Sequence, residues 1–244
     1  MTVTVSWSPN SQPYATLPFE GRRSRVRSNK FATTELAVPI CESTILERGV
    51  CVFVAVAAVL ARYCTSEQVS VGVSKAGSSL ALNVSTPADR KFCELAAGLR
   101  AVLSGLNIGP LDYERQVAES GPDAVEDRRA LFGVLVQLDD EPTTLGQQDV
   151  TLNFDSSSGR LVASYDFRLL RSEVVEGFLR HVRRAIVAFK TDGAATIGDT
   201  QYVDNCEQAN LRLLGSGGLP AFCGAMSDQL SAALLQWGED SVVE

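Results

Sequence analysis

Few side chains in this sequence could move a proton near neutral pH. The 244 residues contain a single histidine, His181. Histidine is the usual general acid or base because its pKa lies near neutrality, so any Ser-His-Asp or Cys-His site would have to use this residue. On a helical projection, His181 lies at the margin of an apolar stripe beside Arg180 and Arg183. We therefore expect it to flank a helix, and we predict no catalytic residue.

Two other segments contain residue types that are common in active sites. The carboxylates of Asp139–Glu141 come just before Pro142, which is typical of a solvated turn. The run Gly215–Gly218 lacks the lysine and the strand-to-helix setting of a phosphate-binding loop. Neither segment indicates catalysis, and the sequence predicts no cofactor site.

The cysteines do not indicate a metal site. None forms a C-x-x-C pair, and no histidine lies near them at metal-ligand spacing. Those inside apolar helical patterns, Cys51, Cys64 and Cys93, are interpreted as buried thiols. This use of cysteine favours a reducing compartment. The six cysteines are Cys41, Cys51, Cys64, Cys93, Cys206 and Cys223.

Charge and hydropathy restrict the partners of the protein. The net charge is −7, and phosphate binding needs a basic face, so we expect no nucleic-acid partner. The basic run Arg22–Lys30 could bind an anion, although we favour the solvated side of an entry loop and strand. The N-terminus lacks a signal-peptide pattern, and the longest apolar run, Val50–Ala61, is too short to span a membrane. We therefore expect a cytoplasmic protein with no membrane partner.

Hydrophobic periodicity predicts an α/β fold in which helices pack on a mixed β-sheet. Strands are expected where apolar residues alternate with polar ones. A nearly continuous apolar run, Leu131–Leu138, is expected near the centre of the sheet. The other predicted strands are Arg25–Thr33, Val69–Val73, Leu80–Val84 and a hairpin of Val150–Phe154 with Leu161–Phe167.

The predicted helices differ in how much of their surface is apolar. Val50–Tyr63 is apolar nearly all round and should be fully buried. A short helix, Pro39–Arg48, is expected before it and should end at Gly49. Thr86 is expected to cap the next helix. Glu173–Lys190 is amphipathic, and the residues opposite its apolar side are Arg180, Arg183 and Arg184.

Several short motifs follow one another in an order that is informative. The buried helix ends in Leu60-Ala61-Arg62-Tyr63, and the strand after it reads Glu67–Val73. In this order, from Leu17 to about Gly215, the motifs resemble the C-terminal lobe of a nonribosomal peptide synthetase condensation domain. The resemblance implies a single chloramphenicol-acetyltransferase-like lobe. The remaining motifs are Leu17-Pro18, Leu80–Val84, Phe92–Leu95, Asn107–Asp112, Tyr165–Phe167 and Asn205–Leu211.

The departures from this family concern its catalytic half. The family does its chemistry with a His-His-x-x-x-Asp-Gly motif in the N-terminal lobe, and the present match starts after the point where that motif would lie. Two segments that engage the N-terminal lobe in the family are shorter here, at Ser74–Ser79 and Asp139–Asp149. The resemblance therefore implies a lobe that has adapted to stand without its partner lobe.

The sequence divides into three parts. Residues 1–16 are expected to be a flexible lead-in, residues 17–214 the truncated condensation-like lobe, and residues 215–244 a linker and the start of an adenylation-domain-like segment. The chain stops as an apolar segment resumes at Val242, which suggests a piece of a longer protein. Large apolar residues recur at helical spacing after the linker and are predicted to dock on an adjacent domain or partner. They are Phe222, Met226, Leu230, Leu234 and Trp237.

The resemblance implies a non-catalytic condensation-like domain in antibiotic or secondary-metabolite biosynthesis. Its expected role is a scaffold for an adjacent adenylation domain or for a partner synthetase protein, and a homodimer also fits. Two alternatives stay open. The chain could be half of a split condensation enzyme that an N-terminal lobe completes in trans, or it could be a module that binds a carrier protein.

Overall fold

The computed structural model describes residues 5–6, 31–39, 44–75, 78–105, 132–138, 148–155 and 158–215. The chain divides into two units, Met1–Tyr202 and Val203–Glu244. The second unit contributes helix α6 (Asn205–Gly215). The Asp204 carboxylate accepts a hydrogen bond of 2.6 Å from the backbone N–H of Glu207 in the first turn. Such a side-chain cap satisfies a helix N–H that has no partner inside the helix.

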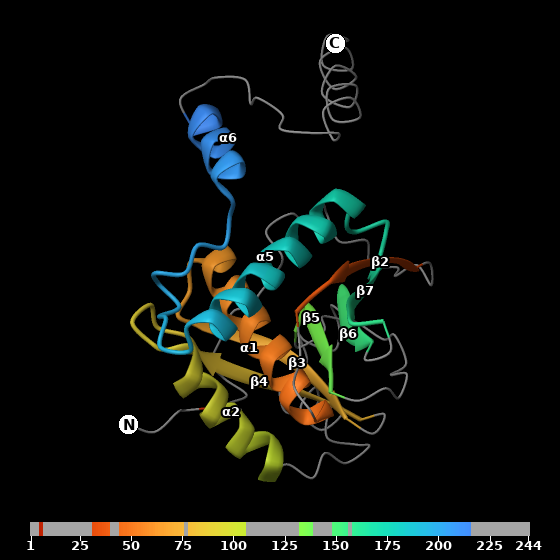
Figure 1. Ribbon diagram of the computed structural model, residues 1–244. Coiled ribbons are helices and arrows are strands. Elements are labelled where there is room, and N and C mark those ends of the chain that lie inside the picture. The colour runs from red at the N-terminus through yellow and green to blue at the C-terminus, as the bar shows by residue number, and fades with distance from the viewer. Residues whose placement is uncertain are drawn as a thin grey trace, which may run out of the picture. The chain divides into compact units, whose positions relative to one another are not determined.

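The first unit is built on a seven-stranded mixed sheet with the order β1-β4-β3-β5-β6-β7-β2 (Figure 1). Neighbouring strands are antiparallel, except that β5 runs parallel to both β3 and β6. The central position predicted for the apolar run that contains β5 is confirmed, and so is the predicted hairpin, which forms β6 and β7. The strands are β1 (Val5–Ser6), β2 (Phe31–Ala37), β3 (Gln68–Lys75), β4 (Ser78–Ser85), β5 (Val134–Gln137), β6 (Val150–Asp155) and β7 (Arg160–Asp166).

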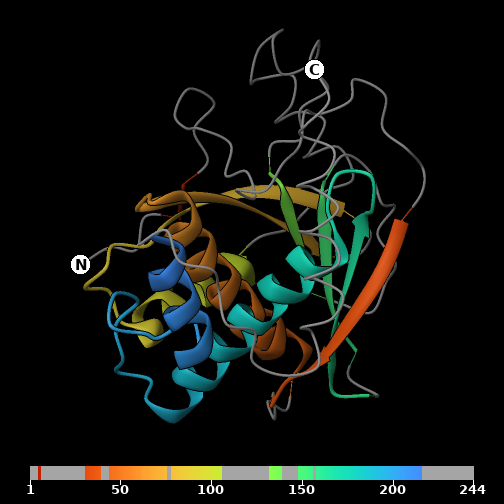
Figure 2. The ribbon, with the colours of Figure 1, turned by 90° about the horizontal axis from the view of Figure 1, so that it is seen from above.

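Among the residues that the structure describes, three helices of this unit cover one face of the sheet (Figures 1 and 2). Helix α1 (Ile45–Cys64) contacts both α2 (Phe92–Gly105) and α5 (Ser172–Thr191), and it also contacts β3, β5 and β6. Helix α5 packs on β2 and β7. The predicted α/β architecture with a mixed sheet is therefore confirmed. Within the part of the chain that the structure describes, no helix is long and apolar enough to cross a membrane.

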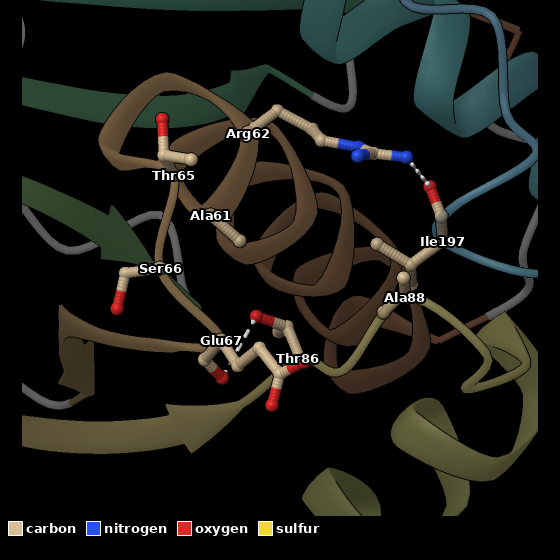
Figure 3. A pocket seen from close by; sticks show the side chains of 8 residues that line it. All are labelled: Ala61, Arg62, Thr65, Ser66, Glu67, Thr86, Ala88 and Ile197. Carbon is tan, nitrogen blue, oxygen red and sulfur yellow. Dashed lines mark hydrogen bonds between the residues drawn. The ribbon is translucent and has the colours of Figure 1, made fainter.

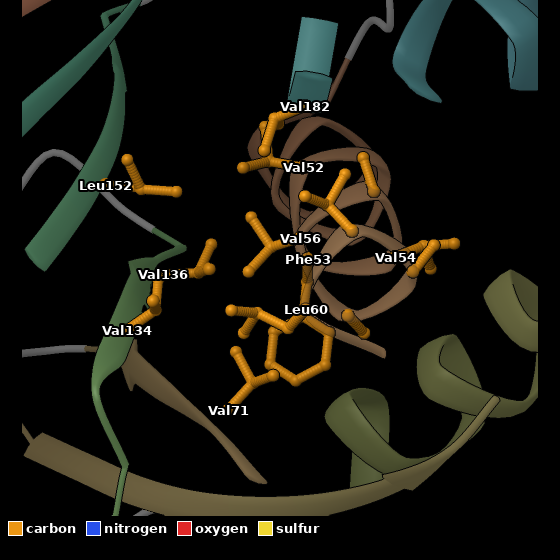
Figure 4. Packing of buried hydrophobic residues seen from close by; sticks show 14 of the residues in the cluster. Val52, Phe53, Val54, Val56, Leu60, Val71, Val134, Val136, Leu152 and Val182 are labelled. Carbon is orange, nitrogen blue, oxygen red and sulfur yellow. The ribbon is translucent and has the colours of Figure 1, made fainter. Parts of the chain in front are cut away.

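Apolar side chains between α1 and the sheet form the main core (Figure 4). Val50–Ala61 is buried along its whole length, as its all-round apolar pattern predicts. Phe53 and Leu60 point towards Val71 on β3, and Val56 points towards Val136 on β5. Burying an aliphatic or aromatic side chain stabilises a fold by roughly 1.5–3 kcal/mol, so this layer supplies much of the driving force for folding.

The sheet carries smaller and more polar side chains on its other face. Because side chains alternate along a strand, Ser70 and Gly72 of β3 point away from the face that holds its core valines. The Ser70 hydroxyl donates a hydrogen bond of 2.5 Å to Oδ1 of Asn83 on β4. The ring of Phe132 lies so close to Gly72 that a Cβ there would clash with it. A small second cluster on this face consists of Ala81, Phe132 and Leu135.

The start of α1 differs from the prediction. A short helix was expected to end at Gly49, but a single helix runs through this residue from Ile45 to Cys64. Thr44 caps it, because its hydroxyl accepts a hydrogen bond of 3.2 Å from the Glu47 N–H. The Thr-x-x-Glu spacing of such a cap is visible in the sequence. Gly49 provides room for a neighbour: an added Cβ would lie 2.5 Å from Cδ2 of Leu138.

Helix α2 begins later than predicted. Thr86 was expected to cap it, but the helix starts at Phe92. The backbone N–H of Thr86 instead donates a hydrogen bond of 2.6 Å to the Glu67 carbonyl, which holds Thr86 beside the start of β3. The N–H of Phe92 donates to the Ala195 carbonyl at 3.2 Å. A long-range backbone partner therefore takes the place of a local side-chain cap at this helix end.

The N-terminal region shows two further differences. Strand β2 covers Phe31–Ala37, whereas the prediction was Arg25–Thr33, of which residues 25–30 lie outside the described residues. Val5–Ser6, within the expected lead-in, pairs with β4 as strand β1.

Candidate functional site

His181 lies in the contact between α1 and α5. It was expected at the margin of the apolar side of its helix, and it is buried there, with only 6% of its surface exposed. Its Nδ1 and the Tyr63 hydroxyl share a hydrogen bond of 2.5 Å. The two rings meet edge to face with centroids 5.7 Å apart, and the Phe178 ring lies 6.0 Å from that of Tyr63. A polar ring can be buried here because a hydroxyl from another helix reaches its nitrogen.

This histidine–tyrosine pair has the properties of a structural link. A general base must come within hydrogen-bond reach of the proton that it removes from a substrate. His181 instead has Nδ1 at the Tyr63 hydroxyl, inside the packing of two helices. Sequence reasoning missed Tyr63, because the partner lies 118 positions away and no local signal connects the two residues.

The described cysteines differ in burial. Cys51 is buried, Cys64 is half-buried and Cys93 is exposed, so the interpretation of Cys93 as a buried thiol is wrong. Its neighbours Phe92 and Leu95 take the core positions of α2 instead. Burial raises the pKa of the Cys64 thiol, which lowers its reactivity as a thiolate.

No group of three potential metal-ligating side chains occurs among the described residues. Cys206 is disulfide-bonded. The reducing compartment was expected from the use of cysteine in the sequence, and it stays a prediction.

A cavity of about 220 Å³ lies at the C-terminal end of α1 (Figure 3). Arg62 extends across its rim and donates hydrogen bonds to the carbonyls of Ile197, at 3.5 Å, and Gly198. Thr65 ends the helix in the left-handed conformation, with φ of 49°. The lining residues are Ala61, Arg62, Thr65, Ser66, Glu67, Thr86, Ala88 and Ile197.

The polar groups around this cavity mainly hold segments of the fold together. Arg62 joins the end of α1 to the segment after α5 through its hydrogen bond to the Ile197 carbonyl. The Thr86 hydroxyl, just after β4, donates a hydrogen bond to the Glu67 carbonyl, just before β3. The cavity lacks a pair of titratable side chains poised for proton transfer. We therefore interpret it as a joint between α1, the β3–β4 hairpin and the segment after α5.

Three sequence-predicted segments lie outside the described residues. They are the carboxylates Asp139–Glu141, the linker beyond Gly215, and the proposed docking residues Phe222, Met226, Leu230, Leu234 and Trp237. Gly215 itself is the last residue of α6.

The fold is shared with solved structures. No family model and no curated protein matches the sequence. The starter condensation domain of rhizomide synthetase RzmA superposes with a TM-score of 0.63 at 18% identity, over 80% of this chain and 52% of that chain. The X-domain of teicoplanin biosynthesis, solved in complex with OxyB, gives a TM-score of 0.61 at 16% identity, over 80% and 53%.

A larger assembly also matches. The four-domain nonribosomal peptide synthetase AB3403, solved bound to AMP and glycine, has a TM-score of 0.59 at 13% identity, over 81% of this chain and 19% of that one. This chain thus spans about half the length of the RzmA and X-domain chains. The seven-stranded sheet and the described helices that cover it have the fold of a condensation domain, of which this chain spans about half.

Proposed function

We propose that this chain is a non-catalytic half of a condensation domain, corresponding to the C-terminal lobe, in a nonribosomal peptide synthetase. The observation that carries the proposal is the placement of His181. The sole histidine of the chain is buried and hydrogen-bonded to Tyr63 within a condensation-type fold. The motif that does the chemistry in the resembling family needs two histidines, and the resemblance of the present sequence begins after the point where that motif would lie.

The role that we propose is a scaffold for an adjacent adenylation domain. Two features support it. AB3403 carries its condensation-type fold within a four-domain chain that was solved with AMP and glycine bound. In the present sequence, the large apolar residues from Phe222 to Trp237 recur at helical spacing and would need a partner surface to bury them. We place the protein in the cytoplasm, in the biosynthesis of a nonribosomal peptide.

The binding of this chain to the adenylation domain of its own synthetase tests the proposal. Isothermal titration calorimetry should detect a complex that Leu230→Ala with Trp237→Ala weakens at least about tenfold, because each truncation removes apolar contact. The control is Asp228→Ala with Gln236→Ala, two positions that lie off the apolar stripe in the helical projection. This control should bind like the unmodified chain.

Two results would overturn the scaffold role. One is the absence of binding at the highest concentration at which both proteins stay soluble. The other is equal weakening by the stripe variant and its control, which would show that the tail makes no specific contact. Circular dichroism of each variant checks that the fold of the lobe is unchanged.

A further inference from the structure

Helix α5 borders an open groove on the surface of the first unit. The groove has a volume of about 600 Å³. Its helical part extends from Arg180 to Thr191, which corresponds to about 16 Å at 1.5 Å per residue. Its lining residues are Arg180, Arg183, Arg184, Val187, Ala188, Thr191 and Gln201. Those on the helix recur three or four positions apart, so they share one face over about three turns.

The groove is basic although the chain as a whole is acidic. The net charge of the chain is −7, yet the segment from Arg180 to Thr191 contains three arginines and Lys190 and no carboxylate. The nearest acidic residues along the helix and its end are Glu176 and Asp192. A concentrated positive patch attracts a negative partner and steers its approach.

Two of the arginines have unused hydrogen-bonding capacity. Within the described part of the chain, the guanidinium groups of Arg180 and Arg183 make no hydrogen bond or ion pair. Arg183 is exposed and Arg180 is half-buried. A guanidinium has five N–H donors in a planar fork that fits a carboxylate in a bidentate manner. These two side chains can therefore receive carboxylates without breaking a hydrogen bond or ion pair within the described residues.

The third arginine forms an ordered wall of the groove. Arg184 donates a hydrogen bond of 3.0 Å to the Tyr202 carbonyl. Tyr202 is held in turn, because its hydroxyl donates to the Ile197 carbonyl at 2.9 Å. This chain of contacts fixes the segment that contains Gln201 against α5. A pre-ordered wall lowers the entropy that a partner must offset on binding.

The groove also has an apolar spot. Val187 lies one turn beyond Arg183 and is 40% exposed, which makes it one of two large hydrophobic side chains that the described residues leave exposed. An exposed aliphatic residue next to arginines resembles part of a protein interface, where apolar contact supplies affinity and charged neighbours supply specificity. The second exposed residue, Phe167, is not among the groove residues.

We propose that this groove binds an acidic amphipathic helix of a partner protein, with two carboxylates one turn apart and an aliphatic residue one turn beyond them. The spacing of Arg180, Arg183 and Val187 matches the spacing of such side chains on a facing helix. An extended polyanion such as nucleic acid is disfavoured, because the chain surrounding the patch is acidic. The inference goes beyond the proposed function: it places a second docking surface on the lobe itself, apart from the residues between Phe222 and Trp237.

Fluorescence anisotropy with defined peptides tests this site on the full chain. The probe is a fluorescein-labelled, alanine-based peptide of about 14 residues, long enough as a helix to span the groove. It carries two glutamates one turn apart and a leucine one turn beyond them. We expect saturable binding at low salt, which Arg180→Glu and Arg183→Glu should each weaken about fivefold to tenfold. Arg168→Glu is the matched control, an exposed arginine outside the groove, and should change affinity less than twofold.

A charge exchange makes the test more specific. The same peptide with lysines in place of glutamates should not bind the unmodified chain, and it should gain affinity for the double variant Arg180→Glu with Arg183→Glu. The site would be overturned if the glutamate peptide does not bind, if a glutamine version binds equally, or if Arg168→Glu weakens binding as much as the groove variants do. If a labelled poly-dT oligonucleotide also binds, and Arg180→Glu and Arg183→Glu weaken its binding by the same factor, the groove is a general anion site and the proposal is overturned. None of these results affects the calorimetric test of the adenylation-domain contact, which depends on Leu230 and Trp237.

Discussion

The hydroxyl of Tyr63 and the imidazole of His181 join the end of α1 to the middle of α5 in the interior of the lobe. Both residues lie where two helices pack together, and each would be costly to bury without a polar partner. This arrangement explains why a polar ring occupies a core position on a helix whose other buried residues are mainly aliphatic. It also removes the sole histidine of the chain from the positions that a substrate could reach directly.

Removing the tyrosine hydroxyl should therefore destabilise the fold. We expect Tyr63→Phe to lower the free energy of unfolding by about 1–2 kcal/mol, since the imidazole nitrogen loses the hydroxyl that faces it. Urea denaturation followed by circular dichroism measures this change. Ser158→Ala, which removes an exposed hydrogen bond to Asp155, serves as the control and should change stability by less than about 0.5 kcal/mol. An unchanged midpoint for Tyr63→Phe would show that the hydrogen bond contributes nothing to stability.

A second residue-scale prediction concerns the end of α1. Thr65 has φ of 49°, a conformation that costs a residue with a Cβ about 1–2 kcal/mol and costs glycine almost nothing. Glycine has more backbone freedom to lose on folding, at about 0.5–1 kcal/mol, so Thr65→Gly should give a net gain of up to about 1 kcal/mol. Thermal unfolding should show a higher midpoint. Ser66→Gly should show a lower one, because it removes the Ser66 hydroxyl bonds to Gln68. A decrease for Thr65→Gly would mean that its side chain contributes more than the strained backbone costs.

At the scale of elements, close contacts with neighbouring side chains hold α1 in place. Two helical glycines illustrate this, because one lies at a tightly packed position and the other has room for a side chain. A Cβ added to Gly49 of α1 would lie only 2.5 Å from Cδ2 of Leu138. Gly177 of α5 has as its nearest neighbour the flexible end of Arg180, at 3.6 Å. Gly49→Ala should destabilise the lobe by about 1–3 kcal/mol through overpacking. Gly177→Ala should stabilise it by about 0.5–1 kcal/mol through helix propensity. Equal effects of the two substitutions on the urea midpoint would contradict this account.

The ion pair between α1 and α2 should make stability depend on pH. Arg100 donates two hydrogen bonds, of 2.6 and 2.7 Å, to the Glu47 carboxylate, and this lowers the pKa of Glu47 below its usual range. A carboxyl whose pKa is lower in the folded state contributes stability above its unfolded pKa and loses it as the pH falls through the folded pKa. Glu47→Gln should thus lower the melting temperature at pH 7, by an amount that corresponds to at most about 1 kcal/mol because the pair is partly exposed. The difference should shrink as the pH falls from 7 through the folded pKa of Glu47, and a difference that stays constant over this titration would exclude the ion pair as its cause.

Local pattern was enough to predict some elements and not others. The all-round apolar run from Val50 to Ala61 and the alternating strands could be read from the sequence because burial alone determines them. The prediction placed a helix end at Gly49, although the Thr44-x-x-Glu47 cap in the sequence marks the start of a longer helix. The close approach of Leu138 to Gly49 could not be read from the sequence. Nor could the burial of His181, because it depends on Tyr63. The arginine spacing on α5 was visible in the sequence, but its combination with Gln201 into a groove required the fold.

At the scale of the whole molecule, a half-length condensation fold carries its own core. The helices and the sheet enclose a continuous apolar cluster, while β3 and β4 place Ser70 and Asn83 in a hydrogen bond on the other face. A lobe that buries its apolar residues against its own helices does not need a second lobe to form its main core. This organisation supports a domain retained for its surfaces, with the adenylation-domain contact and the arginine-lined groove as the candidates for that role.

The absence of condensation activity is the central claim, and a direct assay tests it. The chain is incubated with loaded donor and acceptor carrier proteins of its own synthetase, and peptide-bond formation is followed by mass spectrometry. We predict no product above the protein-free background, either for the unmodified chain or for His181→Ala. We also predict none when an N-terminal condensation lobe is added in trans. Product formed by the unmodified chain, or by the chain together with that added lobe, would contradict the claim, and its loss in His181→Ala would identify the buried histidine as catalytic.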